Sequence, residues 1–187
     1  MTSWSAIVLT GGTNKRFGSD KSAAMLGNQT LLQRVVDAIP KEIAIVVVGE
    51  KPDLQRPVTV VREEPALGGP VAAIAAGLKE ISTDRVAIFA TDMPFAPTLV
   101  NQLLVIDADA VMPVDGDGFR QPLAALYKKD ALEKALADLA LAHNGVLHGE
   151  SMRNLCDHLQ ITELPAAQSA LIDIDTKEDL AKAHEVL

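Results

Sequence analysis

The chain has 187 residues, of which 48% are hydrophobic and 22% charged; this is enough apolar material for one packed core and unlike the composition of a disordered protein. Its 17 Lys and Arg residues against 25 Asp and Glu residues give a net charge of −8, which argues against a nucleic-acid partner or an anionic membrane surface. The longest apolar runs fall far short of the roughly 20 residues that a membrane span needs.

Short β-branched runs alternate with stretches of helical spacing in the first part of the chain, the pattern of a parallel sheet covered by helices. The strands are nearly continuous in apolar residues, as in a sheet that is buried on both faces. We therefore predict an α/β fold of three layers, a mostly parallel twisted sheet with helices on both faces. The predicted strands are residues 6–9, 43–48, 58–61, 86–90 and 110–114, and the helices between them are residues 31–39, 71–78 and 99–105.

The alternation of strand and helix patterns becomes less regular after residue 114. Residues 115–118, Asp-Gly-Asp-Gly, predict a hairpin turn. Thr176 is a good N-cap for a last helix through about residue 186, and Asp179 adds negative charge near its N-terminus, where such charge is favoured. The other predicted elements are a strand at 123–127, helices at 132–141 and about 146–159, and a short strand near 172–174.

No segment is rich enough in Pro or Gly to divide the chain, so we predict a single domain over residues 1–187. The one cysteine, Cys156, cannot form an intrachain disulfide, and the N-terminal residues lack the features of a signal peptide. We expect a cytoplasmic protein.

A glycine-rich run follows the first predicted strand and carries the most information. Residues 9–21 read Leu-Thr-Gly-Gly-Thr-Asn-Lys-Arg-Phe-Gly-Ser-Asp-Lys. Glycines let backbone N–H groups wrap an anion, Arg16 can bind two phosphate oxygens at once, and Lys21 adds a mobile charge. The run is neither a P-loop nor the Gly-x-Gly-x-x-Gly dinucleotide fingerprint. It predicts a triphosphate site, whereas the alternative is a Gly-rich turn with solvated cations.

Asp92 follows the apolar strand 86–90 and is expected at the same sheet edge as the glycine-rich run. A carboxylate that faces a triphosphate suits Mg²⁺, which prefers one or two carboxylates together with phosphate oxygens. Asp173 and Asp175 are candidates for a second metal ligand. The alternatives are a cap for the turn after Asp92 and a cap for the last helix at Asp173 and Asp175.

Four segments together resemble one family. The run 9–21 is similar to the Leu-x-Gly-Gly-x-x-x-Arg-x-Gly-x-Asp-Lys signature of the molybdenum cofactor guanylyltransferases. Residues 63–74, 90–95 and 173–180 resemble, in the same order, the family's acidic residue followed by Gly-Pro-Leu-Ala-Gly-Ile, its Asp-x-Pro-Phe metal motif and its C-terminal Asn-x-Asn-Thr-Pro-Glu-Asp-Leu. The resemblance runs almost from end to end.

The resemblance implies a Rossmann-like nucleotidyltransferase fold with a nucleotide-binding half of about residues 1–108 and an acceptor-binding half of about residues 109–187. It implies Mg²⁺-dependent transfer of GMP from GTP to molybdopterin or the molybdenum cofactor, with release of pyrophosphate. Gln121 and Pro122 would lie beside the acceptor. Arg16, Lys21 and Asp92 would be catalytic, Asp92 would bind the metal, and Asp175 is a candidate second ligand. The nucleotide would be bound by Leu9, Thr10, Gly11, Gly12, Arg16, Lys21, Glu63, Gly69 and Asp92.

Several alternatives stay open at this stage. The glycine motifs favour a guanine base, while Asp173-Ile174-Asp175 resembles the related molybdenum cofactor cytidylyltransferases. A nucleotidyltransferase with another small phosphate acceptor would share everything except the acceptor pocket. A nucleotide-binding protein without turnover, such as a sensor, is the alternative from a different class. We expect a monomer or small homo-oligomer and transient contacts with proteins that deliver or insert the cofactor.

Overall fold

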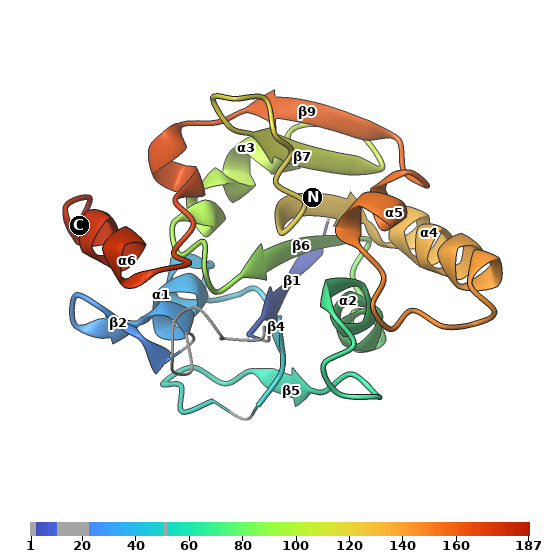
Figure 1. Ribbon diagram of the computed structural model, residues 1–187, viewed down its shortest axis with the longest axis horizontal. Helices are drawn as coiled ribbons and strands as arrows, with labels where there is room; N and C mark the ends of the chain where they lie inside the picture. The colour runs from blue at the N-terminus through green and yellow to red at the C-terminus, as the bar shows by residue number, and fades with distance from the viewer. Residues whose placement is uncertain (1–2, 11–22, 51) are drawn as a thin grey trace.

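The computed structural model describes residues 3–10, 23–50 and 52–187 and has the predicted three layers (Figure 1). The strands are β1 (Trp4–Leu9), β2 (Met25–Leu26), β3 (Gln29–Thr30), β4 (Ile45–Val48), β5 (Thr59–Val61), β6 (Arg85–Ala90), β7 (Ala110–Val114), β8 (Ala124–Lys128) and β9 (Ile161–Pro165). The helices are α1 (Leu31–Ala38), α2 (Pro70–Leu78), α3 (Val100–Leu104), α4 (Lys129–Ala142), α5 (Met152–Cys156) and α6 (Lys177–His184), with 3-10 turns η2 (Ala96–Leu99) and η3 (Gln168–Leu171).

The main sheet has the strand order β5-β4-β1-β6-β8-β7-β9. In the described part of the chain its pairs are parallel except where β8 pairs with β6 and β7, so the sheet is mostly parallel, as predicted. The small hairpin of β2 and β3 forms a separate sheet.

Alternate residues of each central strand enter opposite halves of the core, which is why these strands are apolar throughout. On β1, Ala6 and Val8 pack with α1 and α3 on one face. Ile7 and Leu9 pack with α2, α4 and α5 on the other. Gly77 lets α2 approach closely, because a Cβ there would lie 2.9 Å from the side chain of Val48.

The order of the strands reverses at β1. The chain passes from β1 to its neighbour β4 and on to β5, and then returns to β6 on the other side of β1. Because such crossovers are right-handed, the two directions of travel put α1 and α2 on opposite faces of the sheet. In open α/β sheets, ligands bind beyond the carboxyl ends of the strands at such a reversal, which here are the ends of β1 and β6.

Two predicted elements in the C-terminal part are wrong. The helix predicted at 146–159 is only the short α5, because Gly149 adopts a left-handed backbone conformation and Ser151 caps a new start. The strand predicted near 172–174 is absent from this described segment. Instead, the N–H of Ile174 donates one hydrogen bond to the carbonyl of Asp92 at 2.9 Å.

The sequence prediction also missed some strands. The edge strand β9 was overlooked because its exposed Thr162 and Glu163 weaken the apolar pattern. The strands of the β2–β3 hairpin are too short to give a periodic signal. The last helix agrees with the prediction: Thr176 caps α6 and Asp179 completes a capping box. No helix in the described ranges is long and apolar enough to cross a membrane.

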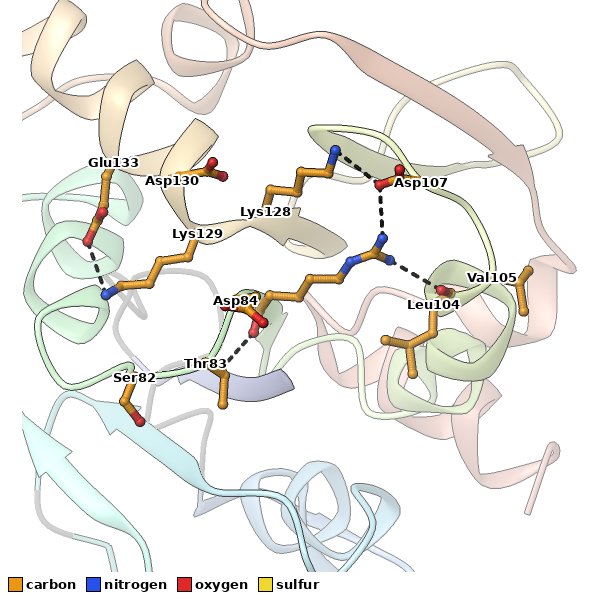
Figure 2. A pocket seen from close by; sticks show the side chains of 11 residues that line it. Ser82, Thr83, Asp84, Leu104, Val105, Asp107, Lys128, Lys129, Asp130 and Glu133 are labelled. Carbon is orange, nitrogen blue, oxygen red and sulfur yellow. Dashed lines mark hydrogen bonds and ion pairs between the residues drawn. The ribbon is translucent and has the colours of Figure 1, made fainter. Parts of the chain in front are cut away.

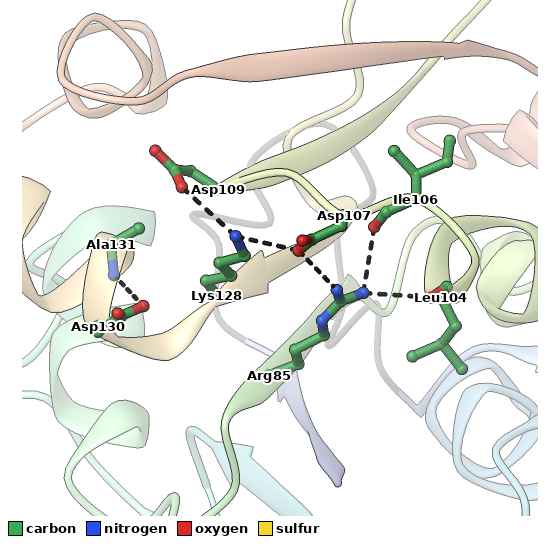
Figure 3. Close-up of polar contacts among 8 residues, drawn as sticks. All are labelled: Arg85, Leu104, Ile106, Asp107, Asp109, Lys128, Asp130 and Ala131. Carbon is green, nitrogen blue, oxygen red and sulfur yellow. Dashed lines mark hydrogen bonds and ion pairs between the residues drawn. The ribbon is translucent and has the colours of Figure 1, made fainter. Parts of the chain in front are cut away.

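A polar cluster lies at the opposite end of the central strands, where β6 begins (Figure 3). The buried guanidinium of Arg85 donates to the carbonyls of Leu104 and Ile106 at 3.2 and 3.1 Å and to Asp107 at 3.1 Å. Lys128 approaches the same carboxylate at 3.0 Å. Arg85 therefore ties the end of α3 to the central sheet.

A groove of about 850 Å³ lies beside this cluster (Figure 2). Its cations are already paired within the chain, Arg85 and Lys128 with Asp107 and Lys129 with Glu133. It opens at the start of β6, whereas Asp92 follows the end of that strand. The groove is therefore at the opposite end of β6 from Asp92.

We expect Arg85→Met to lower the free energy of unfolding by about 2–3 kcal/mol, because the carbonyls of Leu104 and Ile106 lose a buried charged donor. Urea denaturation at neutral pH measures this loss. A loss no larger than that of a typical surface substitution would contradict the role of Arg85 in the fold.

Asp107→Asn is the matched control, and its loss should be smaller because the Asp107 side chain is 80% exposed. The hydrogen bond from Lys128 lowers the pKa of Asp107 below its ordinary value. The stabilisation by this carboxylate is therefore present above the ordinary carboxyl pKa and is lost as the pH falls through the lower, folded-state value. The difference between Asp107→Asn and wild type should disappear in strong acid.

Candidate functional site

The ends of β1 and β6 lie side by side. Leu9 is the register partner of Ala90, and the N–H of Thr91 donates to the carbonyl of Leu9 at 3.1 Å. The next residue after β1, Thr10, is fixed by hydrogen bonds from its N–H and its hydroxyl to the carbonyl of Val48 at 3.1 and 3.0 Å. Thr10 and Asp92 thus leave adjacent strands at the same edge of the sheet. The predicted site residues Gly11, Gly12, Arg16 and Lys21 lie outside the described residues.

Three carboxylates gather at this edge. One oxygen each of Asp92, Asp173 and Asp175 lies within 4.8 Å of the other two, with Asp92 half-buried and the other two exposed. Like charges this close repel one another, and a bound cation removes the repulsion. Oxygen donors at this spacing fit Mg²⁺, a hard cation that binds carboxylates and phosphate oxygens.

The C-terminal segment is held beside Asp92 by the burial of Ile174. Ile174, between the two exposed aspartates, is fully buried against Leu26, Leu31 and Ala183 in a small third core cluster. Phe95, which follows the Asp92 turn, also packs against this cluster. The cluster therefore joins α6, the hairpin after the glycine-rich run and the Asp92 turn.

The N-terminus of α6 is capped by Thr176, whose hydroxyl accepts from the N–H of Asp179 at 3.1 Å. Thr176 therefore occupies the N-cap position, and the alternative in which Asp173 or Asp175 caps this helix is not supported. The hydrogen bond from Thr176 lowers the pKa of Asp179, so its carboxylate is ionised at neutral pH.

Glu63 and Gly69 lie in the loop that connects β5 to α2. The carboxylate of Glu63 accepts from the N–H of Leu67 at 3.1 Å, and Leu67 has a left-handed φ of 62° although its side chain is exposed. Gly69 is the N-cap of α2. Its φ of 88° is a backbone conformation that favours glycine. The carbonyl of Gly68 accepts from the N–H of Gly149, which holds the loop before α5 against this one.

Gln121 and Pro122 lie just before β8. The amide of Gln121 donates to Asp115 at 3.0 Å, and the carbonyl of Pro122 accepts from the hydroxyl of Tyr127 at 2.7 Å. Burial raises the pKa of Tyr127 well above its ordinary value, so it remains a neutral donor. The carbonyl of Leu123, which follows Pro122, accepts from the N–H of Ala90 at 2.9 Å. Pro122 is thus held close to the end of the strand that leads to Asp92.

Cys156 does not provide a nucleophile for this edge. Burial raises the pKa of its thiol to about 11, so it is protonated at neutral pH. The sequence named Asp173 and Asp175 as candidates for a second metal ligand and favoured Asp175, whereas the structure places both in the carboxylate group with Asp92. Their alternation around an apolar residue, Asp-Ile-Asp, was the available signal.

Comparisons with known proteins identify the family and the fold of the chain. The chain matches the MobA-like NTP transferase domain family over residues 6–160. It is 27% identical to a protein of Bacillus cereus named probable molybdenum cofactor guanylyltransferase, over 100% of this chain and 98% of the relative.

Solved structures have the same fold. One is the molybdopterin-guanine dinucleotide biosynthesis protein A of Archaeoglobus fulgidus, with a TM-score of 0.74 and 20% identity over 97% of each chain. Another is the 2-C-methyl-D-erythritol 4-phosphate cytidylyltransferase of Francisella tularensis, with a TM-score of 0.74 and 16% identity over 100% of each chain. The match over residues 6–160 shows that the chain belongs to the MobA-like NTP transferase domain family and is a nucleotidyltransferase.

Proposed function

We propose that the protein transfers GMP from GTP to the terminal phosphate of molybdopterin or the molybdenum cofactor, which yields the guanine dinucleotide and pyrophosphate. The observation that carries this proposal is the carboxylate group of Asp92, Asp173 and Asp175 beside the end of β1, where the glycine-rich run begins. The names of the Bacillus and Archaeoglobus relatives support guanine and molybdopterin as the substrates.

In this proposal Asp92 is the main Mg²⁺ ligand and Asp175 the second, with Asp173 close enough to contribute. Bound Mg²⁺ would neutralise charge on the triphosphate and on the leaving pyrophosphate. Arg16 and Lys21 would bind the outer phosphates, and Gly11 and Gly12 would bring backbone N–H groups close to the nucleotide. Leu9, Thr10, Glu63 and Gly69 would line the base and ribose site.

The reaction needs positioning more than proton transfer. An oxygen of the acceptor phosphate forms a bond to the α-phosphorus of GTP, and the bond from that phosphorus to the bridging oxygen breaks to release pyrophosphate. A phosphate monoester has a second pKa near 6, so the nucleophile is largely dianionic at neutral pH and needs no strong base. Gln121 and Pro122 would hold the acceptor in line, and the fixed cations would offset the repulsion between the two anions.

The second candidate is transfer of CMP from CTP. The Asp-Ile-Asp sequence at 173–175 favours it, because it resembles the cytidylyltransferases of the same cofactor. A nucleotidyltransferase with a different small phosphate acceptor is the related alternative. A non-catalytic nucleotide-binding protein is no longer supported, because the chain belongs to a nucleotidyltransferase family.

The remaining features of the proposal concern organisation and partners. We propose one domain whose halves, about residues 1–108 and 109–187, bind the nucleotide and the acceptor. A cytoplasmic location suits a chain with a single cysteine. Transient contact with proteins that deliver or insert the cofactor would follow from the product, which must be handed on.

We expect pyrophosphate release from GTP in the presence of molybdopterin and Mg²⁺, and much slower release from CTP and ATP. The measurement is a coupled pyrophosphate assay with each nucleotide, with and without molybdopterin. Faster release from CTP would establish the cytidylyltransferase alternative. Release that requires some other phosphate acceptor would reject molybdopterin.

We expect Asp92→Asn to lower kcat by at least about 100-fold at saturating Mg²⁺, because the neutral amide is a poor ligand for a hard divalent cation. Circular dichroism and thermal melting check that the fold is retained. Asp107→Asn is a matched control, since it removes an exposed carboxylate at the opposite edge of the sheet. Wild-type activity in Asp92→Asn would remove this residue from the metal site.

We expect Glu63→Ala to raise the KM for GTP roughly 10-fold or more, the effect of losing one hydrogen bond to a charged group. A carboxylate can accept from the adjacent N1–H and N2 amino donors of guanine or from ribose hydroxyls. Steady-state kinetics with GTP and with CTP separate these two roles, because only loss of a base contact changes the ratio of the two KM values. Unchanged KM values for both nucleotides would exclude Glu63 from the site.

A further inference from the structure

The capping box at the start of α6 includes one more backbone N–H group than an ordinary capping box. In an ordinary capping box the N3 side chain accepts one hydrogen bond from the backbone of the N-cap residue. Here Oδ2 of Asp179 accepts from the N–H of Thr176 at 2.9 Å, from its hydroxyl at 2.7 Å and from the N–H of Asp175 at 3.3 Å. The carboxylate therefore holds the backbone of the residue that precedes the helix cap.

That residue, Asp175, belongs to the carboxylate group at the end of β6. The backbone before it is held as well, because the N–H of Ile174 donates to the carbonyl of Asp92 and the Ile174 side chain is fully buried. Three consecutive N–H groups, those of residues 174, 175 and 176, thus have fixed acceptors. Two of these three acceptor interactions depend on Asp179.

This anchoring matters because the carboxylate of Asp175 is exposed and lies among like charges. Repulsion from Asp92 and Asp173 favours conformations in which Asp175 turns away from the group. A fixed backbone at 174–176 limits that movement and keeps the oxygen near the other two. Residues that orient metal ligands in this way typically change metal affinity about 10–100-fold when they are replaced.

We propose that Asp179 is a positioning residue for the divalent metal, acting through the backbone of Asp175 and Thr176. This inference rests on the proposed function, in which Asp92 and Asp175 bind Mg²⁺. Asp179 itself is not one of the three carboxylates that lie together at this site, and its Oδ2 is engaged by three donors from residues 175 and 176. The C-terminal helix would thereby contribute to the metal site without supplying a ligand.

The chain offers a matched pair of variants. Asp179→Ala removes the acceptor of both backbone N–H groups, whereas Thr176→Ala removes the hydroxyl that caps Asp179 and leaves both N–H groups with their acceptor. Each variant loses one half of the capping box, so both should lower the melting temperature of the protein to a similar degree. Only Asp179→Ala should loosen Asp175.

The experiment titrates the full-length variants with Mn²⁺ alone and follows the free ion by electron paramagnetic resonance. We expect the Kd for Mn²⁺ to rise about 10-fold in Asp179→Ala and less than about 2-fold in Thr176→Ala. Asp179→Asn, which keeps one acceptor oxygen, should fall between wild type and Asp179→Ala. The Mg²⁺ concentration for half-maximal pyrophosphate release should shift in the same order.

Equal shifts in Asp179→Ala and Thr176→Ala would overturn the inference, because helix stability alone would then explain them. An unchanged Kd in Asp179→Ala, together with a raised Kd in Asp175→Asn, would also overturn it while leaving the metal site intact. If Asp92→Asn and Asp175→Asn both bind Mn²⁺ as wild type does, the metal site of the proposed function fails, and the positioning role fails with it.

Discussion

The parallel pairing of β1 with β6 determines where the rest of the site can lie. Both strands are buried on both faces, so their side chains are committed to the core and only the residues beyond their ends can meet a ligand. The register brings Leu9 opposite Ala90, and the chain therefore leaves the two strands side by side. Because α1 and α2 cover opposite faces of the sheet, these strand ends are at the kind of reversal where open α/β sheets bind ligands. Thr10 and the Asp92 turn follow the two strand ends at that point.

The charge distribution of the chain suits a reaction that brings two anionic substrates together. Residues 1–21 have a net charge of +2 and the rest of the chain −10, so the positive charge is local and the body is acidic. A polymer with many phosphates needs an extended basic surface, whereas one triphosphate needs a single loop. The carboxylate group at the end of β6 would add its own repulsion to that of the substrates unless a cation lies between them. An acidic protein can thus use a polyanionic substrate when the metal belongs to the site.

Much of the central sheet could be predicted from the sequence, because strands buried on both faces leave long apolar runs such as 86–90. The position of Asp92 followed from the same pattern. The C-terminal part was harder. Ile174 is held by one backbone hydrogen bond and by burial against residues far away in the sequence, and neither leaves a local periodicity. The helix predicted at 146–159 was wrong because Gly149 takes a left-handed conformation that composition alone does not reveal. The role proposed for Asp179 depends on an acceptor geometry that only the folded chain provides.

The small core under α6 has a consequence for the dynamics of the molecule. Among the described residues this cluster buries few side chains, while the two clusters that flank the sheet bury many. We therefore expect α6 and its capping segment to have a lower free energy of opening than the sheet. Opening of α6 would carry Asp173 and Asp175 away from Asp92 while the sheet stayed folded. A cation shared among these carboxylates would bind only the closed form, and mass action would then couple the occupancy of the cation to the protection of the α6 amides from solvent exchange.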